Sequence, residues 1–262
     1  MKRNTSYPEY DEHKNFRLTD EQRPYFGLDV IDKQWQEVEI KERTTVFYDG
    51  NIIKKIITWE TFRQYEYAEF DTELITQDRQ FVLPKTAKGK EKKITPTSLL
   101  SFTPTGCRVY ISLQVPYFKS QVLAWCPRNS IKLPITGSEG LKTISDLKEW
   151  LETYINTRPR DYFDKVQKMR TMAHRTVKYS IGDIFRFEID REHYGFGIII
   201  GKLRDLLMQG VFPQGHPMHS AMTVPLLIRL YTIKAKDKDL SVDEITKHRL
   251  LPADLMCDNE II

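Results

Sequence analysis

The sequence lacks the features that would assign it at once to a chemical class. Its three cysteines, Cys107, Cys126 and Cys257, are odd in number and far apart, which excludes a disulfide framework and a C-x-x-C zinc knuckle. No run approaches the ~18 consecutive apolar residues that a membrane helix needs, and the first residues lack the apolar core of a signal peptide. We therefore expect a soluble protein in the reducing cytoplasm, with no contact to a membrane.

An excess of charge of one sign is also missing. The chain has 40 Lys and Arg residues against 36 Asp and Glu residues, a formal net charge of +4, which is too small to indicate nucleic-acid binding by itself. Hydrophobic residues make up 40% of the chain and aromatic residues 11%, which is typical of globular proteins rather than disordered ones. The 262 residues suffice for one large domain or two ordinary ones, and either can bury a core.

Motifs for catalysis, phosphate binding and metal binding are incomplete. Gly137-Ser-Glu-Gly140 lacks the glycine that a nucleophile elbow requires two positions before its serine. Near Lys88-Gly-Lys90, Pro84 replaces the first glycine of a phosphate-binding loop and Glu91 replaces its Ser or Thr. His216-Pro-Met-His219 offers two imidazoles without a third ligand at metal spacing, so a polar loop is the simpler interpretation. We therefore expect no enzymatic activity, no metal and no cofactor.

The first two thirds of the chain read as a β-rich domain. Residues 1–17 are charged and poor in apolar residues, which predicts a flexible arm, and Thr19-Asp-Glu-Gln22 fits a capping box for a short helix that ends at Gly27. Prolines between the later apolar runs favour edges and turns over helix. Alternating apolar residues and turn signals predict strands at 44–48, 52–59, 65–70, 81–83, 108–113 and 121–125.

Two helices are predicted after these strands. An apolar stripe at helical spacing, from Leu147 to Ile155, predicts a helix with Ser145 or Thr143 as its N-cap. Pro159 ends it, and a second helix is expected over 161–173. We place the domain boundary in this region, with 18–160 as a β-rich α+β domain, 161–178 as a helical linker and 179–262 as a C-terminal β domain.

The C-terminal domain begins with the clearest strand signal of the chain. Apolar residues nearly alternate with polar ones over 179–190, and the turn Asp190-Arg-Glu-His193 leads into the apolar run 194–201, which predicts a β-hairpin. Gly195 and Gly197 suit a strongly curved antiparallel sheet or a small barrel, because glycine permits bending and close backbone approach. Asp183 is expected to hold a turn by accepting backbone N–H bonds. The fold class is thus α+β, mostly β, with two linking helices between the domains.

This domain resembles a known family. Gly182-Asp-Ile-Phe185, Tyr194-Gly-Phe-Gly197 with Ile198–Gly201 behind it, and the later strand Leu226–Ile233 resemble the Immunity protein 26 family, the small β-rich antidotes that accompany bacterial polymorphic toxins. The resemblance covers about the last third of the chain. It implies a non-enzymatic protein whose partner is a cognate toxin domain, which it neutralises by steric and electrostatic occlusion.

Several residues are candidates for contacting such a partner. The one dense charge cluster is the lysine cluster Lys85–Lys93. It is interpreted either as a contact site for an acidic protein surface or as a solvated hairpin loop. Exposed tyrosines combine a large contact area with a low entropy cost. The candidates are Lys85, Lys88, Lys90, Lys92, Lys93, Tyr65, Tyr67, Tyr194, His216 and His219.

A second function from another class stays open at this point. The Gly-Asp-Ile start of the curved β unit also resembles the small barrels of toxin endoribonucleases, and the lysine cluster could track phosphates. The alternative is therefore a nucleic-acid-binding or RNA-processing protein. The nearly balanced charge and the lack of an identifiable Arg, His and acid group count against it.

Overall fold

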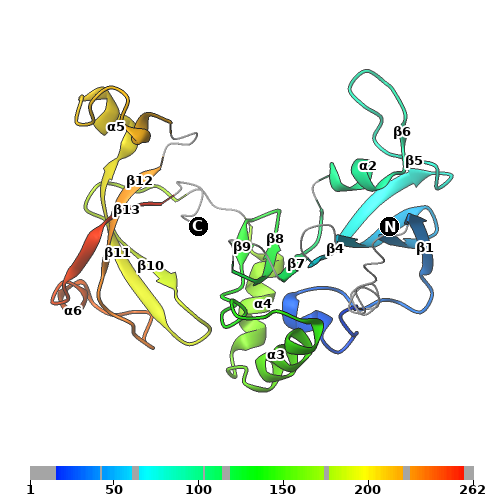
Figure 1. Cartoon of the computed structure of the whole chain (residues 1–262), viewed down its shortest axis with the longest axis horizontal. Helices are drawn as coiled ribbons and strands as arrows, with labels where there is room; N and C mark the ends of the chain where they lie inside the picture. Colours follow the sequence, from blue (N-terminus) through cyan, green and yellow to red (C-terminus); the bar gives the residue numbers. More distant parts are fainter. Residues whose placement is uncertain are drawn as a thin grey trace, which may run out of the picture. The chain divides into compact units, whose positions relative to one another are not determined.

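The chain folds into two compact units. The computed structural model describes residues 16–41, 43–60, 65–102, 104–113, 119–173, 177–220 and 225–256 (Figure 1). Unit 1 spans Met1–Ala173 and unit 2 spans His174–Ile262, so the division falls inside the segment 161–178 in which we expected a boundary. The predicted arm, 1–17, lies outside the described residues except for its last two. Each unit has its own antiparallel sheet, and the predicted mostly-β α+β class is confirmed.

Unit 1 is built on one large sheet. Its path runs β1-β2-β3-β4-β7-β8-β9, and β5 and β6 extend from the end of β4. The described strands are β1 (Gln36–Lys41), β2 (Thr44–Asp49), β3 (Ile52–Glu60), β4 (Tyr65–Gln77), β5 (Phe81–Val82), β6 (Lys92–Lys93), β7 (Arg108–Leu113), β8 (Gln121–Cys126) and β9 (Ile131–Lys132). The helical segments are η1 (Arg23–Phe26), α2 (Pro96–Leu100), α3 (Ile144–Asn156) and α4 (Tyr162–Thr171).

Local signals located most of these elements. Thr19 and Gln22 exchange the reciprocal bonds of the predicted capping box, and Gly27 ends the short helix with φ 75°. Thr143, one of the two predicted N-caps, caps α3. Pro96 was expected to oppose a helix, and this was wrong. It occupies the first turn of α2, where no intrahelical N–H is needed, and Thr95 and Ser98 form a capping box there.

Apolar side chains cover both faces of the sheet in unit 1. One core contains Ile57 of β3 and Phe47 of β2 together with buried residues of α3 and α4, so both helices are part of this core. The adjacent Val46 and Ile56 point to the opposite face and belong to a second, smaller core. This alternation follows from the period of two in a strand.

Unit 2 has an open four-stranded sheet in the order β10-β11-β12-β13. Its elements are β10 (Ile184–Glu188), β11 (Tyr194–Lys202), α5 (Leu203–Met208), η2 (Pro217–Ser220), β12 (Leu226–Tyr231), α6 (Val242–Ile245) and β13 (Leu250–Met256). In the described part of the chain no ladder joins β10 to β13, so of the two predicted forms the sheet is present and a closed barrel is not. Strand β13 was not predicted because it contains Pro252, which an edge strand tolerates. Asp183 accepts the predicted turn bond from the Ser180 N–H at 2.7 Å.

Candidate protein-binding surfaces

The lysine cluster lies on the β5–β6 hairpin of unit 1. Lys85, Lys88 and Lys90 are exposed, and Lys85 forms a long ion pair of 3.4 Å with Glu91. Lys92 has a different role, because its ammonium lies 4.2 Å from the ring centroid of Phe102 and donates to Ser101 Oγ at 3.0 Å. Its ammonium group is therefore less available to a partner than those of the neighbouring lysines.

Two of the predicted contact residues are not on the surface. Tyr65 is 2% exposed and Tyr67 is fully buried, so neither is available to a partner, and the prediction for both was wrong. Tyr67 packs edge-on against Phe16 at 5.3 Å and donates its hydroxyl proton to Glu69. A strand face rich in tyrosine looks the same in the sequence whether solvent or another segment covers it. Here the segment that contains Phe16 and Leu18 covers it.

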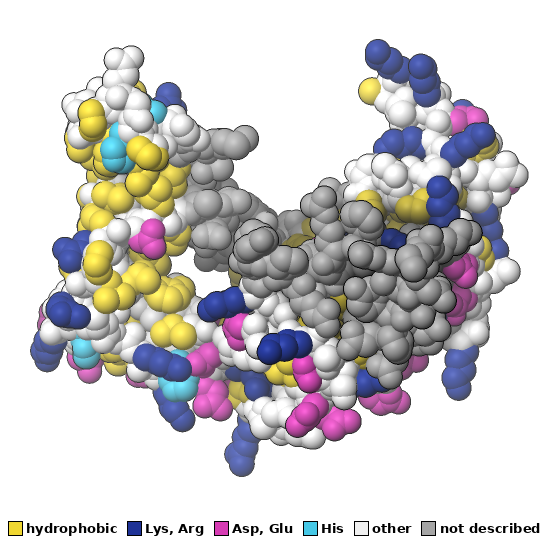
Figure 2. Space-filling model, in the orientation of Figure 1, with side chains coloured by type: hydrophobic (Ala, Val, Ile, Leu, Met, Phe, Trp, Pro, Cys, Tyr) yellow, Lys and Arg dark blue, Asp and Glu magenta, His cyan; other side chains and the backbone are white. Residues whose placement is uncertain are grey.

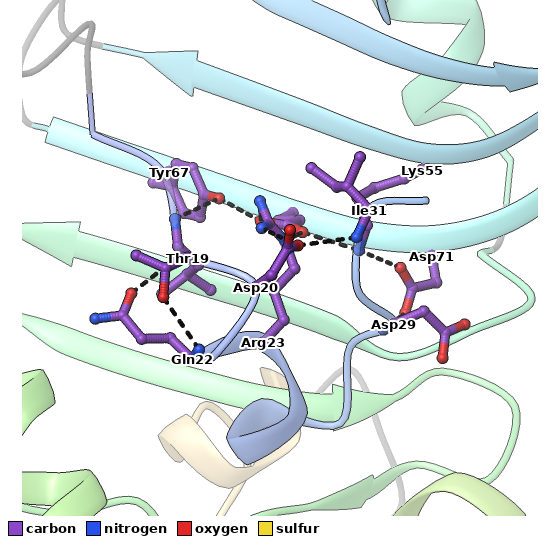
Figure 3. Close-up of polar contacts among 11 residues, drawn as sticks. Thr19, Asp20, Gln22, Arg23, Asp29, Ile31, Lys55, Tyr67 and Asp71 are labelled. Atoms are coloured by element: carbon purple, nitrogen blue, oxygen red, sulfur yellow. Dashed lines mark hydrogen bonds and ion pairs between the residues drawn. The ribbon is translucent and has the colours of Figure 1, made fainter. Parts of the chain in front are cut away.

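Beside Tyr67 lies a buried charge cluster that the sequence analysis missed (Figure 3). Lys55 Nζ of β3 lies 2.8 Å from Glu69 Oε1 and 2.5 Å from Asp71 Oδ1, both on β4. Arg23 Nε of η1 lies 2.6 Å from Glu69 Oε1. The Asp29 N–H also donates to Asp71 Oδ2 at 2.8 Å. The cluster thus attaches the segment 19–31 to the centre of the sheet.

The carboxyl groups of this cluster titrate differently. Burial would raise the pKa of Glu69, but Lys55 and Arg23 outweigh burial and hold the pKa below its usual value. Burial raises the pKa of Asp71 to about 6, although Lys55 opposes the shift. Within the cluster each cation faces a carboxylate, so the charges compensate one another and offer no free charge to a ligand.

A sequence signal for the cluster does exist. On β4, Tyr65, Tyr67, Glu69 and Asp71 alternate onto one face, so two acids share the face that the tyrosines bury. Lys55 lies in an apolar strand, where an unpaired charge is costly. Together these features indicate an internal ion pair, but they do not show which cation meets which acid.

The raised pKa of Asp71 gives a pH-dependent prediction. The native protein binds a proton more tightly than the unfolded chain, whose reference pKa is 3.8, so wild type loses stability relative to Asp71→Asn as pH rises through about 6. We expect a relative loss of roughly 1–3 kcal/mol between about pH 4 and pH 7. Urea unfolding of both proteins at several pH values measures it. Glu73→Gln, at a carboxylate that is 66% exposed, is the control, and parallel profiles of wild type and Asp71→Asn would contradict the prediction.

Unit 2 exposes an aromatic pair on one face of its sheet. Phe187 lies opposite Gly195 and Phe185 opposite Gly197 in the β10–β11 ladder. A Cβ atom on either glycine would lie 2.4 Å from the ring across from it, so the absence of side chains lets both rings rest on the strand. The ring centroids are 6.2 Å apart, and both side chains are half-buried. Phe185 also packs against the buried residues Ile199, Leu226 and Ile228, so the pair is supported from below and is partly exposed.

Unit 2 also exposes further apolar side chains. Of the eleven exposed large hydrophobic side chains among the described residues, six come from unit 2, although it is the smaller unit. Figure 2 shows hydrophobic side chains gathered along unit 2, with Lys and Arg side chains toward one end. The six are Val177, Ile181, Met208, Val211, Val242 and Leu251. Exposed apolar area rimmed by charge is typical of protein-interaction surfaces.

The other predicted contact residues of unit 2 are spread over its surface. Tyr194 is half-buried on the face opposite the phenylalanine pair, with the Arg186 guanidinium 5.6 Å from its ring centroid. His216 packs against Phe212 at 4.9 Å between ring centroids, and His219 is exposed on η2. The structure therefore does not bring Tyr194 and the two histidines into one site.

The described residues form neither a cluster suited to a metal ion nor a helix suited to a membrane. That part of the chain contains no group of three or more His, Cys, Asp or Glu side chains arranged to hold a metal ion. Its helices are all too short or too polar to cross a membrane.

Comparison with known proteins gives a family match within unit 2. Residues 180–262 match the model of the family Immunity protein 26, which confirms the resemblance seen in the sequence for the C-terminal third of the chain. At that level the match associates unit 2 with immunity to a toxin. No curated protein and no solved structure is significantly similar to the chain.

Proposed function

We propose that this chain is a bacterial immunity protein that binds a cognate toxin domain through unit 2 and neutralises it by occlusion. The observation that carries the proposal is the family match, which covers nearly all of unit 2. The protein would act in the cytoplasm as a binding partner and not as an enzyme.

The surface of unit 2 suits this role. Phe185 and Phe187 offer preordered aromatic area, and aromatic anchors supply most of the binding energy in many interfaces. Because Gly195 and Gly197 let the rings rest on the strand, little side-chain entropy remains to be lost on binding. The mechanism we propose needs no reacting group, since covering the active site of a toxin inactivates it.

The test is purification of the tagged full-length chain from its native cell, with identification of what elutes in stoichiometric amount. We expect a toxin domain encoded beside it that stops growth when expressed alone and is harmless when this chain is co-expressed. Recovery of RNA, lost as salt is raised, would instead support the nucleic-acid alternative. A neighbouring toxin that neither co-elutes nor is neutralised would refute the proposal.

A further inference from the structure

Unit 1 contains a groove between two free strand edges. In the described residues β1 pairs only with β2, and β6 pairs only with β5. Strand β4 pairs with β3 and, at its end, with β5. The strands β1 to β6 are therefore a continuous run within the nine-stranded sheet, which also continues from β4 to β7, and β1 and β6 are the two ends of this run. An unpaired edge presents a row of free backbone donors and acceptors.

A cavity of about 400 Å³ lies between these edges. Both edge strands contribute to its wall, so the cavity lies beside both of them, and Val38, Ile40 and Ile94 also pack against the smaller core of unit 1. Its lining is mostly apolar, with a few polar groups, as in sites that bind ligands. The lining residues are Val38, Ile40, Tyr48, Arg79, Gln80, Phe81, Lys93 and Ile94.

Arg79 is held firmly in this groove. Asp78 and Arg79 both adopt left-handed backbone conformations, with φ 50° and 55°, in the turn between β4 and β5, which is uncommon for residues other than glycine. The Arg79 guanidinium lies 4.6 Å from the ring centroid of Tyr48, and its Nε donates to the Gly50 carbonyl at 2.8 Å. A second bond, from Nη1, reaches Gln36 Oε1 on β1. The cation is thus fixed beside the groove before any partner arrives.

The charge around the groove is positive. Lys93 is exposed and lines the cavity, and Lys85, Lys88 and Lys90 lie on the same hairpin. The acids of β1 are Glu37 and Glu39, which alternate with the lining residues Val38 and Ile40 and so belong to the other face. Glu91 on the same hairpin pairs with Lys85 at 3.4 Å, so a carboxylate in the groove would find more cations than acids near it.

We propose that this groove binds an extended acidic segment of another protein, which adds as a strand along the free edge of β1. Edge backbone groups would bind its main chain, the cavity would hold its apolar side chains, and Arg79 and Lys93 would pair with its carboxylates. The matching sequence alternates apolar and acidic residues. The six residues of β1 set the length of the segment at roughly six to eight residues. This site is separate from the unit 2 surface and does not depend on the proposed toxin-binding role.

The test uses the full-length chain and a fluorescein-labelled peptide of four Val-Glu repeats, with fluorescence anisotropy as the readout. We expect this peptide to bind at least about tenfold more tightly than four Val-Lys repeats. Two further peptides carry N-methyl groups on alternate amides, one peptide at the odd positions and the other at the even positions. At least one of them should bind roughly tenfold more weakly, because N-methylation removes the backbone N–H donors of the β-ladder.

Matched variants place the binding in the groove. Lys93→Glu, at an exposed position, should lower the affinity for the acidic peptide roughly five- to tenfold without affecting the fold. Lys168→Glu makes the same change of charge on the exposed side of α4 and should leave the affinity unchanged. Higher salt should weaken binding to wild type more than to Lys93→Glu.

Other occupants of the groove would give different results. No binding of the acidic peptide, or equal binding to wild type and Lys93→Glu, would overturn the proposal. So would preferential binding of a dT12 oligonucleotide, which would assign the groove to phosphates. If the chain does not bind the peptide but sedimentation velocity shows a dimer that Lys93→Glu dissociates, the groove would be assigned to a second copy of the chain.

Discussion

Replacement of Lys55 by methionine is expected to lower the free energy of unfolding of unit 1 by about 3–5 kcal/mol. The ammonium group is fully buried between Glu69 and Asp71, so its removal takes away the cation that these two buried carboxylates share. Methionine fills the volume of the lysine stem, which separates the loss of charge from the creation of a cavity. The cost therefore comes from uncompensated charge in an environment that water does not reach.

The neighbouring lysine supplies the control. Lys54 Nζ pairs with Glu73 Oε1 at 2.7 Å, but Glu73 is 66% exposed, so Lys54→Met should cost under about 1 kcal/mol. Urea titration followed by tryptophan fluorescence measures both variants. All four tryptophans (Trp35, Trp59, Trp125 and Trp150) lie in unit 1, so the signal follows that unit alone.

A second substitution tests the cause of the loss. In the Lys55→Met background, Asp71→Asn removes a carboxylate that has lost its cation, and we expect it to restore part of the stability. Equal losses for Lys55→Met and Lys54→Met, or an additive further loss on Asp71→Asn, would show that the buried pairs are not important for stability.

Phe187→Ala is expected to weaken binding of the toxin identified by co-purification by about 2 kcal/mol or more, which is roughly 30-fold. The half-buried ring rests over Gly195 and presents its outer side to solvent. An aromatic ring in this position gains contact area on binding and loses little freedom. Isothermal titration calorimetry with an inactive toxin variant measures the change.

Two further variants separate binding from folding. Phe187→Leu keeps an apolar side chain and should recover part of the affinity. Val242→Ala truncates an exposed residue of α6, a helix that packs through Ile245 on the face of the sheet opposite Phe187, and should leave the affinity within about twofold of wild type. Circular dichroism of each variant reports whether unit 2 is intact. An unchanged affinity in Phe187→Ala with an intact fold would move the interface away from the phenylalanine pair.

Local patterns in the sequence located most of the regular elements of both units, although strand β1 was not predicted. Period-two alternation identified β10 and much of β4, and an apolar stripe at helical spacing identified α3. The Asp183 turn was predictable because its hydrogen bond closes over three residues. Strand β13 was missed because proline is a poor strand signal. Pro252 is tolerated there because β13 is an edge strand, which has a neighbouring strand on one side only.

The candidate sites depended more on long-range contacts. Tyr67 was predicted to be an interface residue and is buried. The alternation along its strand shows which residues share a face of the sheet, but it does not show whether solvent or another segment covers that face. Lys55 and Glu69 are fourteen positions apart and meet only because β3 and β4 pair in one register. The groove needs β1 and β6 at the two ends of one continuous run of strands, which no local motif specifies.

The sequence by itself determined the element types, the mostly-β class and the family resemblance of the last third, since each depends on side chains close together along the chain. Tertiary structure alone decided which tyrosines are buried, how the internal charges pair, and which strand edges and aromatic faces remain open. These properties depend on strand register and on the covering of one segment by another, which bring together residues that are far apart in the sequence.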